Sequence, residues 1–112
     1  MKLLNKTQNS LLTENMQEAN TIFKKIKGLL GRKSIGEDEC LLIPGAKQIH
    51  CFFMRFPIDI VFLDKNKKII KIYKNFKPYR MTSFIFFAKH VLEFKVGFCE
   101  SKNTKLGDAL EW

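Results

Sequence analysis

The spacing of short apolar runs constrains the fold most, because these runs follow one another closely from residue 40 onward. Each run is too short for a typical helix and is bounded by turn-forming residues, as β-strands usually are. The expected strands are Cys40–Ile43, Gln48–Phe53, Ile58–Leu63, Ile69–Phe76, His90–Val96 and Ala109–Trp112. Many short strands at such close spacing predict a compact, mostly antiparallel β-sandwich or barrel.

One earlier segment has a different period. Between Glu14 and Leu30 the apolar residues recur at steps of three and four, which is the spacing of one face of an amphipathic helix. Thr13 is a suitable N-cap, and Gly28 and Gly31 are suitable residues at the C-terminal end. We therefore expect an α+β fold, mainly β, with one N-terminal amphipathic helix packed against the sandwich or barrel.

The length of 112 residues fits a single domain, residues 1–112, that needs no disulfide to bury a core. No apolar stretch approaches the roughly 20 residues that cross a bilayer, and the first residues lack the apolar segment of a signal peptide. The sequence therefore predicts a cytoplasmic protein with no membrane partner. Its three cysteines are expected to be free thiols.

A formal net charge of +9 favours polyanionic partners. Between Lys65 and Arg80, seven basic residues are interleaved with Tyr73, Phe76 and Tyr79, a composition that suits single-stranded nucleic acid. A spacing near three does not, however, place side chains on one face of a strand. A solvated hairpin is therefore the favoured interpretation, and nucleic-acid binding is the alternative.

The run Phe84–Ala88 is more apolar than a loop usually is. It either completes the core or forms an exposed patch that contacts a partner. We favour the core, and the exposed alternative would suit a homodimer. The expected assembly is accordingly a monomer or a homodimer.

Three blocks of residues carry a resemblance to a known family. They are Lys27–Arg32, His50–Asp64, and Val91–Gly97 followed by Gly107-Asp108. In this order they resemble domain-of-unknown-function family 192, a group of small bacterial and archaeal proteins. The resemblance implies a compact β-rich fold with a helix near the N-terminus, and it implies no established activity, cofactor or substrate.

Asp59 interrupts the apolar run Ile58–Leu63. A carboxylate there has to be hydrogen-bonded, paired with a cation or protonated. In a catalytic interpretation Asp59 and Glu93 form an acid–base pair beside His50, which makes these three the candidate catalytic residues. In the favoured structural interpretation Asp59 bonds backbone amides or Arg55, and Glu93 lies on a solvated strand face.

The sequence also contains residue types that bind soft metals, namely His50, Cys51, Met54, His90 and Cys99. None of them has the tight spacing of a metal site, and adjacent strand residues point to opposite faces. Neither Cys51 nor Cys99 lies in a recognisable nucleophile motif. We therefore expect no metal, no cofactor and no catalytic cysteine.

The leading hypothesis is a non-enzymatic binding or accessory module for an unknown small ligand or protein partner. Its predicted binding residues are His50, Met54, Arg55, Asp59 and Glu93. The first rival is an enzyme, which requires a pocket with both carboxylates facing inward and one abnormally high pKa. The second rival is nucleic-acid binding through the basic hairpin.

Overall fold

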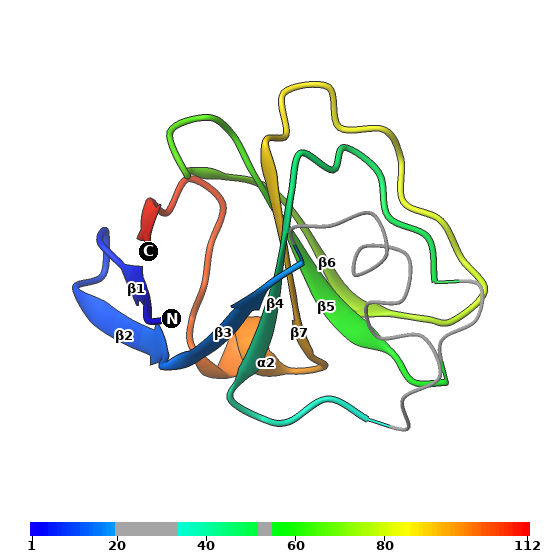
Figure 1. The fold of residues 1–112 in the computed structure, drawn as a ribbon, viewed down its shortest axis with the longest axis horizontal. Coiled ribbons are helices and arrows are strands. Elements are labelled where there is room, and N and C mark those ends of the chain that lie inside the picture. The colour runs from blue at the N-terminus through cyan, green and yellow to red at the C-terminus, as the bar shows by residue number, and fades with distance from the viewer. Residues whose placement is uncertain (20–33, 52–54) are drawn as a thin grey trace.

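The computed structural model describes residues 1–19, 34–51 and 55–112, which form two β-sheets and one short helix. In chain order the elements are β1 (Leu3–Asn5), β2 (Ser10–Thr13), β3 (Asn15–Glu18), β4 (Glu39–Pro44), β5 (Ile58–Leu63), β6 (Ile69–Phe76), β7 (His90–Lys95), α2 (Phe98–Ser101) and β8 (Leu110–Glu111). Figure 1 shows the β1–β2 hairpin at one end of the long axis and the strands of the larger sheet beside it. Within the described ranges, no helix is long and apolar enough to cross a membrane.

The larger sheet has the strand order β3-β4-β7-β5-β6. Its β3–β4 pair is parallel, and the other pairs are antiparallel. β5 and β6 form over the predicted residues, and β7 ends one residue before the predicted end. The predicted strand Gln48–Phe53 is not confirmed over its described residues, where only His50 pairs, in an isolated bridge with Met81.

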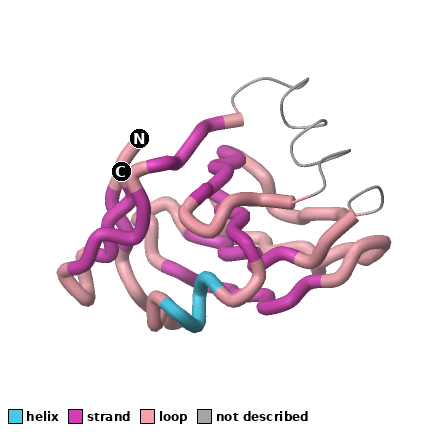
Figure 2. The backbone as a smooth tube through the Cα atoms, turned by 90° about the horizontal axis from the view of Figure 1, so that it is seen from below, coloured by secondary structure: helices cyan, strands magenta, loops and turns pink. Residues whose placement is uncertain are grey.

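The smaller sheet has the order β2-β1-β8 and joins the two ends of the sequence. Leu4 and Asn5 of β1 pair with Glu111 and Leu110 of β8. The buried Asn5 Nδ2 also donates a 2.9 Å hydrogen bond to Asp108 Oδ2. Figure 2 shows the two termini side by side as a result.

The prediction of an N-terminal amphipathic helix is wrong for the part of that segment that the structure describes. Residues 15–18 of that segment form β3, whose residues pair in parallel with Glu39–Leu42 of β4. Met16 and Ala19 are three residues apart, which suits a helix face, but Met16 packs into one core and Ala19 into the other. Residues 20–30 of the predicted helix lie outside the described residues. The fold is therefore mostly β with two sheets, and the helix that the described chain contains, α2, lies near the C-terminal end.

Apolar side chains cover both faces of the larger sheet. The first core lies between the two sheets and includes Leu3, Leu12, Leu42, Val61, Leu92, Phe94 and Leu110. The second core covers the other face and includes Ile35, Ile43, Ile49, Ile58, Ile60, Phe62 and Val91. Because both sides are covered, all six residues of β5 are buried, as the nearly continuous apolar run requires.

Candidate functional site

Asp59 is buried in β5, and its carboxylate accepts hydrogen bonds from three backbone amides. Its Oδ1 accepts a hydrogen bond from the amide of Asn75 at 2.9 Å. Its Oδ2 accepts bonds from the amides of Gly97 at 3.2 Å and Cys99 at 3.1 Å. The carboxylate therefore ties β5 to the end of β6 and caps the start of α2, where free amides favour a negative charge. This is the structural role that the sequence suggested as the alternative to catalysis.

Glu93 is buried in β7 on the opposite face of the same sheet. Its register partners are Ile60 in β5 and Leu41 in β4, whereas Asp59 pairs with Phe94. Only 5% of Glu93 is exposed, and burial raises the pKa of its carboxyl group from the ordinary 4.5 to about 7. Among the described residues no hydrogen bond or ion pair reaches this carboxylate.

The structure therefore does not bring the two candidate carboxylates together. Neighbouring residues of a strand point to opposite faces, and Asp59 lies opposite Phe94 while Glu93 lies opposite Ile60. The expectation of a solvated Glu93 is also wrong, because the second core covers that face of β7. The enzyme hypothesis required both carboxylates in one pocket, and this requirement is not met.

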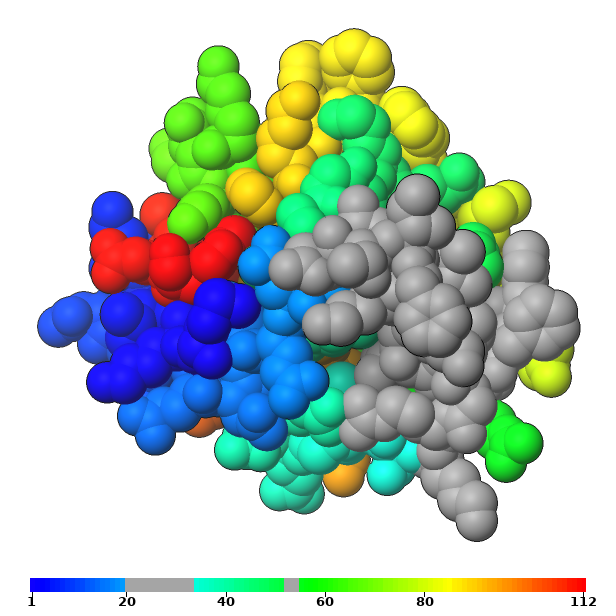
Figure 3. Space-filling view, viewed as in Figure 1, coloured from blue at the N-terminus to red at the C-terminus, as the bar shows by residue number. Residues whose placement is uncertain are grey.

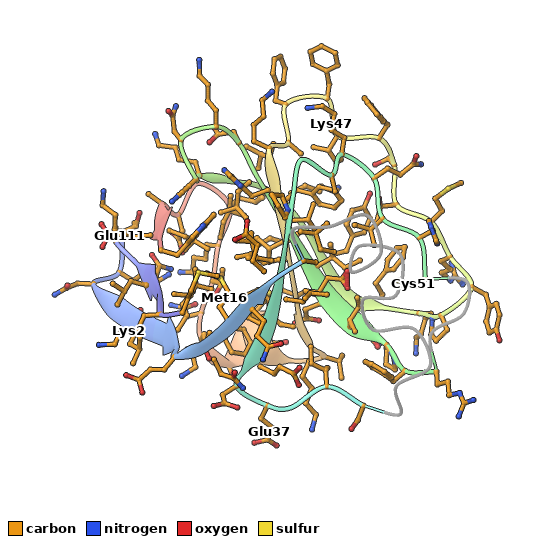
Figure 4. The ribbon with its side chains drawn as sticks, viewed as in Figure 1. Lys2, Met16, Glu37, Lys47, Cys51 and Glu111 are labelled. Atoms are coloured by element: carbon orange, nitrogen blue, oxygen red, sulfur yellow. The ribbon has the colours of Figure 1, made fainter. Side chains whose placement is uncertain are left out.

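The two carboxylates influence different cysteine thiols, Asp59 that of Cys99 and Glu93 those of Cys51 and Cys40. Burial and the nearby Asp59 carboxylate raise the pKa of Cys99 to about 12. Burial and the negative charge of Glu93 raise the pKa of Cys51, labelled in Figure 4, to about 12. Burial also raises the pKa of Cys40 well above its ordinary value. The three cysteines are free, as expected, and their thiols stay protonated at neutral pH, which does not suit nucleophilic catalysis.

The remaining predicted site residues are scattered. His50 and Arg55 are exposed, and Met54 lies outside the described residues. His90 is half-buried, its ring packs edge-on against Trp112 at 5.0 Å, and burial lowers its pKa. In the described part of the chain, no group of three His, Cys, Asp or Glu residues is arranged to hold a metal ion.

The loop between β6 and β7, residues 77–89, is held as an extended ribbon along residues 45–51 (Figure 1). The amide of Tyr79 donates a hydrogen bond to the carbonyl oxygen of Cys51 at 2.6 Å, and the amide of Cys51 donates one to the carbonyl oxygen of Arg80 at 2.8 Å. Further along the loop, the amide of Ile85 donates a hydrogen bond to the carbonyl oxygen of Lys47 at 2.7 Å. The backbone of this loop is thus fixed by long-range hydrogen bonds.

The same loop presents five large apolar side chains to solvent. We call them the aromatic surface: Tyr79, Met81, Phe84, Phe86 and Phe87, with exposed fractions from 56% to 73%. In Figure 3 the later residues of this loop, coloured yellow, lie at the upper edge of the molecule, and its first residues, coloured yellow-green, lie at the right-hand edge. The favoured prediction that Phe84–Ala88 completes the core is wrong for the three phenylalanines, although Ala88 is fully buried.

The charged residues of the two segments that form this ribbon, residues 45–51 and 77–89, are all basic. The sequence has no Asp or Glu from residue 40 to 58 or from residue 65 to 92. Lys77, Arg80 and Lys89 are exposed on the loop itself. Lys47, labelled in Figure 4, donates to the carbonyl oxygens of Phe86 at 2.8 Å and Ala88 at 2.7 Å. The surface therefore combines apolar side chains with fixed cations.

Comparison with known proteins places the chain in one family. Residues 3–112 match DUF192, described as Uncharacterized ACR, COG1430. The chain belongs to the DUF192 family. Among its relatives, UPF0127 proteins of Thermococcus sibiricus and Pyrococcus furiosus are each 30% identical to it over 98% of the chain, and the matches cover 73% and 97% of those proteins.

A solved structure is also similar to this chain. The crystal structure of a protein of unknown function from Novosphingobium aromaticivorans superposes with a TM-score of 0.81, covering 99% of this chain and 82% of that one. The identity is 22%, so this similarity shows the fold alone. The family resemblance is thereby confirmed, and it assigns no specific function.

Two residues of the third block that carried the DUF192 resemblance now have a structural explanation. Gly97 has a φ of +91°, a conformation that side chains rarely adopt, and it directs the chain from β7 into α2. Asp108 Oδ2 accepts bonds from Asn5, Gln8 and the amide of Lys105, which ties β1 to the turn before β8. These residues support the fold, so the aromatic surface is the feature of the described chain left without a structural role.

Proposed function

We propose that this DUF192 protein is a non-enzymatic binding module that attaches to a larger partner through the aromatic surface. The observation that carries this proposal is the exposure of five large apolar side chains on a hydrogen-bonded backbone. Contiguous exposed apolar patches on soluble proteins usually mark interaction sites. A fixed backbone supports the same function, because little conformational entropy is then lost on binding.

The buried polar groups support binding rather than chemistry. Asp59 accepts hydrogen bonds from three backbone amides, and the thiols of Cys51 and Cys99 have raised pKa values. Of the residues predicted to bind, His50 lies beside the loop through its bridge with Met81. His50 therefore borders the aromatic surface, whereas Glu93 lies in the second core.

Photo-crosslinking in living host cells tests the proposal without assuming what the partner is. The photoreactive residue p-benzoylphenylalanine replaces Phe86 in one variant and Leu11 in a control variant. Leu11 is 45% exposed and lies in β2, away from the loop (Figure 1). We expect discrete covalent adducts from position 86 and none from position 11.

The adduct should also disappear when Phe84 and Phe87 are replaced by serine in the same chain, because they form part of the same surface. Circular dichroism of each variant checks that the fold is retained. Equal labelling at positions 86 and 11, or no adduct at position 86, would contradict the proposal.

A further inference from the structure

The aromatic surface combines two properties that together describe one class of partner. Its side chains are mainly hydrocarbon, and the charged residues of the two segments that form the ribbon, residues 45–51 and 77–89, are all basic. We propose that the partner is an anionic phospholipid bilayer, on which the protein docks from the side without crossing it. This inference rests on the proposed function, because it names the partner of the same surface.

The apolar part of the surface suits the boundary between lipid headgroups and acyl chains. Phe86 and Phe87 pack edge to face, with ring centroids 5.1 Å apart, and both rings are more than two-thirds exposed. Phe84 and Met81 add further hydrocarbon on the same ribbon. Proteins that lie on a bilayer bury aromatic and aliphatic side chains of this kind a few ångströms below the headgroups.

Basic side chains lie on the same ribbon as the phenylalanines and are available to bind lipid phosphates. Lys77, Arg80 and Lys89 are exposed on the loop that carries the phenylalanines, and the Nζ atom of Lys47 is 5.9 Å from the centroid of the Phe86 ring. No acidic residue occurs in either segment of the ribbon, residues 45–51 and 77–89, to repel an anionic membrane. Basic residues beside a bilayer strengthen its binding through the negative surface potential.

Two other occupants fit less well. A second copy of the chain would place two ribbons whose charged residues are all basic against each other, which is repulsive. Single-stranded nucleic acid stacks its bases on open ring faces, but Phe86 has Phe87 against it and Lys47 near its face. The sequence prediction of no membrane partner depended on the lack of a segment that crosses the bilayer. Docking on the surface of a bilayer does not require such a segment.

Vesicle co-sedimentation with the full chain tests the inference. The probes are vesicles of phosphatidylcholine alone and of phosphatidylcholine mixed with phosphatidylglycerol. We expect binding to the anionic vesicles, weaker binding at high salt and little binding to the neutral ones. Phe86→Ser with Phe87→Ser should lower the partition coefficient about 100-fold, and Arg80→Gln with Lys89→Gln should lower it about 20-fold.

Matched controls are available on the β1–β2 hairpin. Leu11→Ser removes an exposed apolar side chain, and Lys6→Gln removes an exposed cation, both on the side of the molecule away from the loop (Figure 1). Each control should change the partition coefficient less than about twofold, because surface substitutions outside an interface have small effects. Equal losses from the loop and hairpin variants would overturn the inference.

The possible results distinguish a wrong choice of partner from a wrong proposed function. If neither vesicle binds but position 86 still gives crosslinked adducts in cells, the bilayer is excluded and the binding module stands. An adduct of twice the chain mass would identify a second copy instead. Preferential binding of a single-stranded oligonucleotide, lost in the phenylalanine variant, would replace lipid by nucleic acid. Absence of both vesicle binding and adducts would remove both proposals.

Discussion

Asp59 and Glu93 are two buried carboxylates on adjacent strands, and their surroundings are opposite. Asp59 accepts hydrogen bonds from three backbone amides, whereas no described residue bonds or neutralises Glu93. Burial raises the pKa of Glu93 to about 7. The same residue class, at the same depth and in the same sheet, therefore stabilises the fold at one position and opposes it at the other.

The comparison shows that burial of a charged group does not by itself identify a functional site. A carboxylate whose lone pairs are occupied by amides has no acceptor capacity left for a substrate. A carboxylate without partners destabilises the folded state whenever it is ionised. The following experiments measure how large this difference is.

The largest expected effect is that of Asp59→Ala. The substitution removes the acceptor of three amides, those of exposed Asn75 and Gly97 and of buried Cys99, and we expect a loss of about 3–5 kcal/mol in the free energy of unfolding. Urea denaturation measures it. Glu100→Ala, which removes an exposed carboxylate from α2, is the control and should cost less than about 0.5 kcal/mol. Similar losses in the two variants would show that Asp59 does not anchor α2.

Glu93→Gln should act in the opposite direction and depend on pH. Because the folded-state pKa is raised from 4.5 to about 7, the folded state binds the proton more tightly, and stability falls as the pH rises between these values. Above pH 7 the variant should be more stable than the wild type by about 3 kcal/mol. Below pH 4.5 the two should be equal, because both side chains are then neutral.

Urea denaturation of both proteins at each end of this pH range measures the difference. A variant less stable than the wild type above pH 7 would mean that the Glu93 carboxylate has a favourable partner. The contrast with Asp59 would then disappear.

The smallest effect concerns the two thiols. Glu93→Gln should lower the pKa of the Cys51 thiol and leave Cys99 unchanged, whereas Asp59→Asn should do the reverse. Each change should be less than about one pKa unit, because burial is the larger cause of both raised values. Alkylation rates at the two cysteines, followed by peptide mass spectrometry over a range of pH, resolve the two sites. A response of both thiols to both substitutions would show that the carboxylates act on a common site.

The sequence predicted the strands whose apolar runs are long. Ile58–Leu63 and Ile69–Phe76 form where expected, because their composition and turn residues act locally. β1 and β3 were missed for a different reason: each is short, and its pairing partner lies far away, at residues 110–111 for β1 and in β4 for β3. Pairing over such distances leaves no periodic signal in a short segment.

The candidate site was predictable only in part. Asp59 is the one charged residue in an apolar run, so the sequence predicted that its carboxylate needs a hydrogen-bonding partner. The bonds from backbone amides confirm this prediction. The alternation in β7 could not show that both faces are covered, so the burial of Glu93 was missed. The run Phe84–Ala88 has no period, and whether its rings point inward depends on hydrogen bonds to residues 45–51.

The pairing of β1 with β8 has a consequence for the order of folding. On the ribosome, β1 is synthesised about a hundred residues before β8, so β1 lacks one neighbour until residues 110–111 have been added. The buried bond between Asn5 and Asp108 forms equally late. Contacts between residues so distant in sequence slow folding because a long loop must close first. Completion of the smaller sheet accordingly waits for β8, and until then the edge of β1 that pairs with β8 is open to other chains.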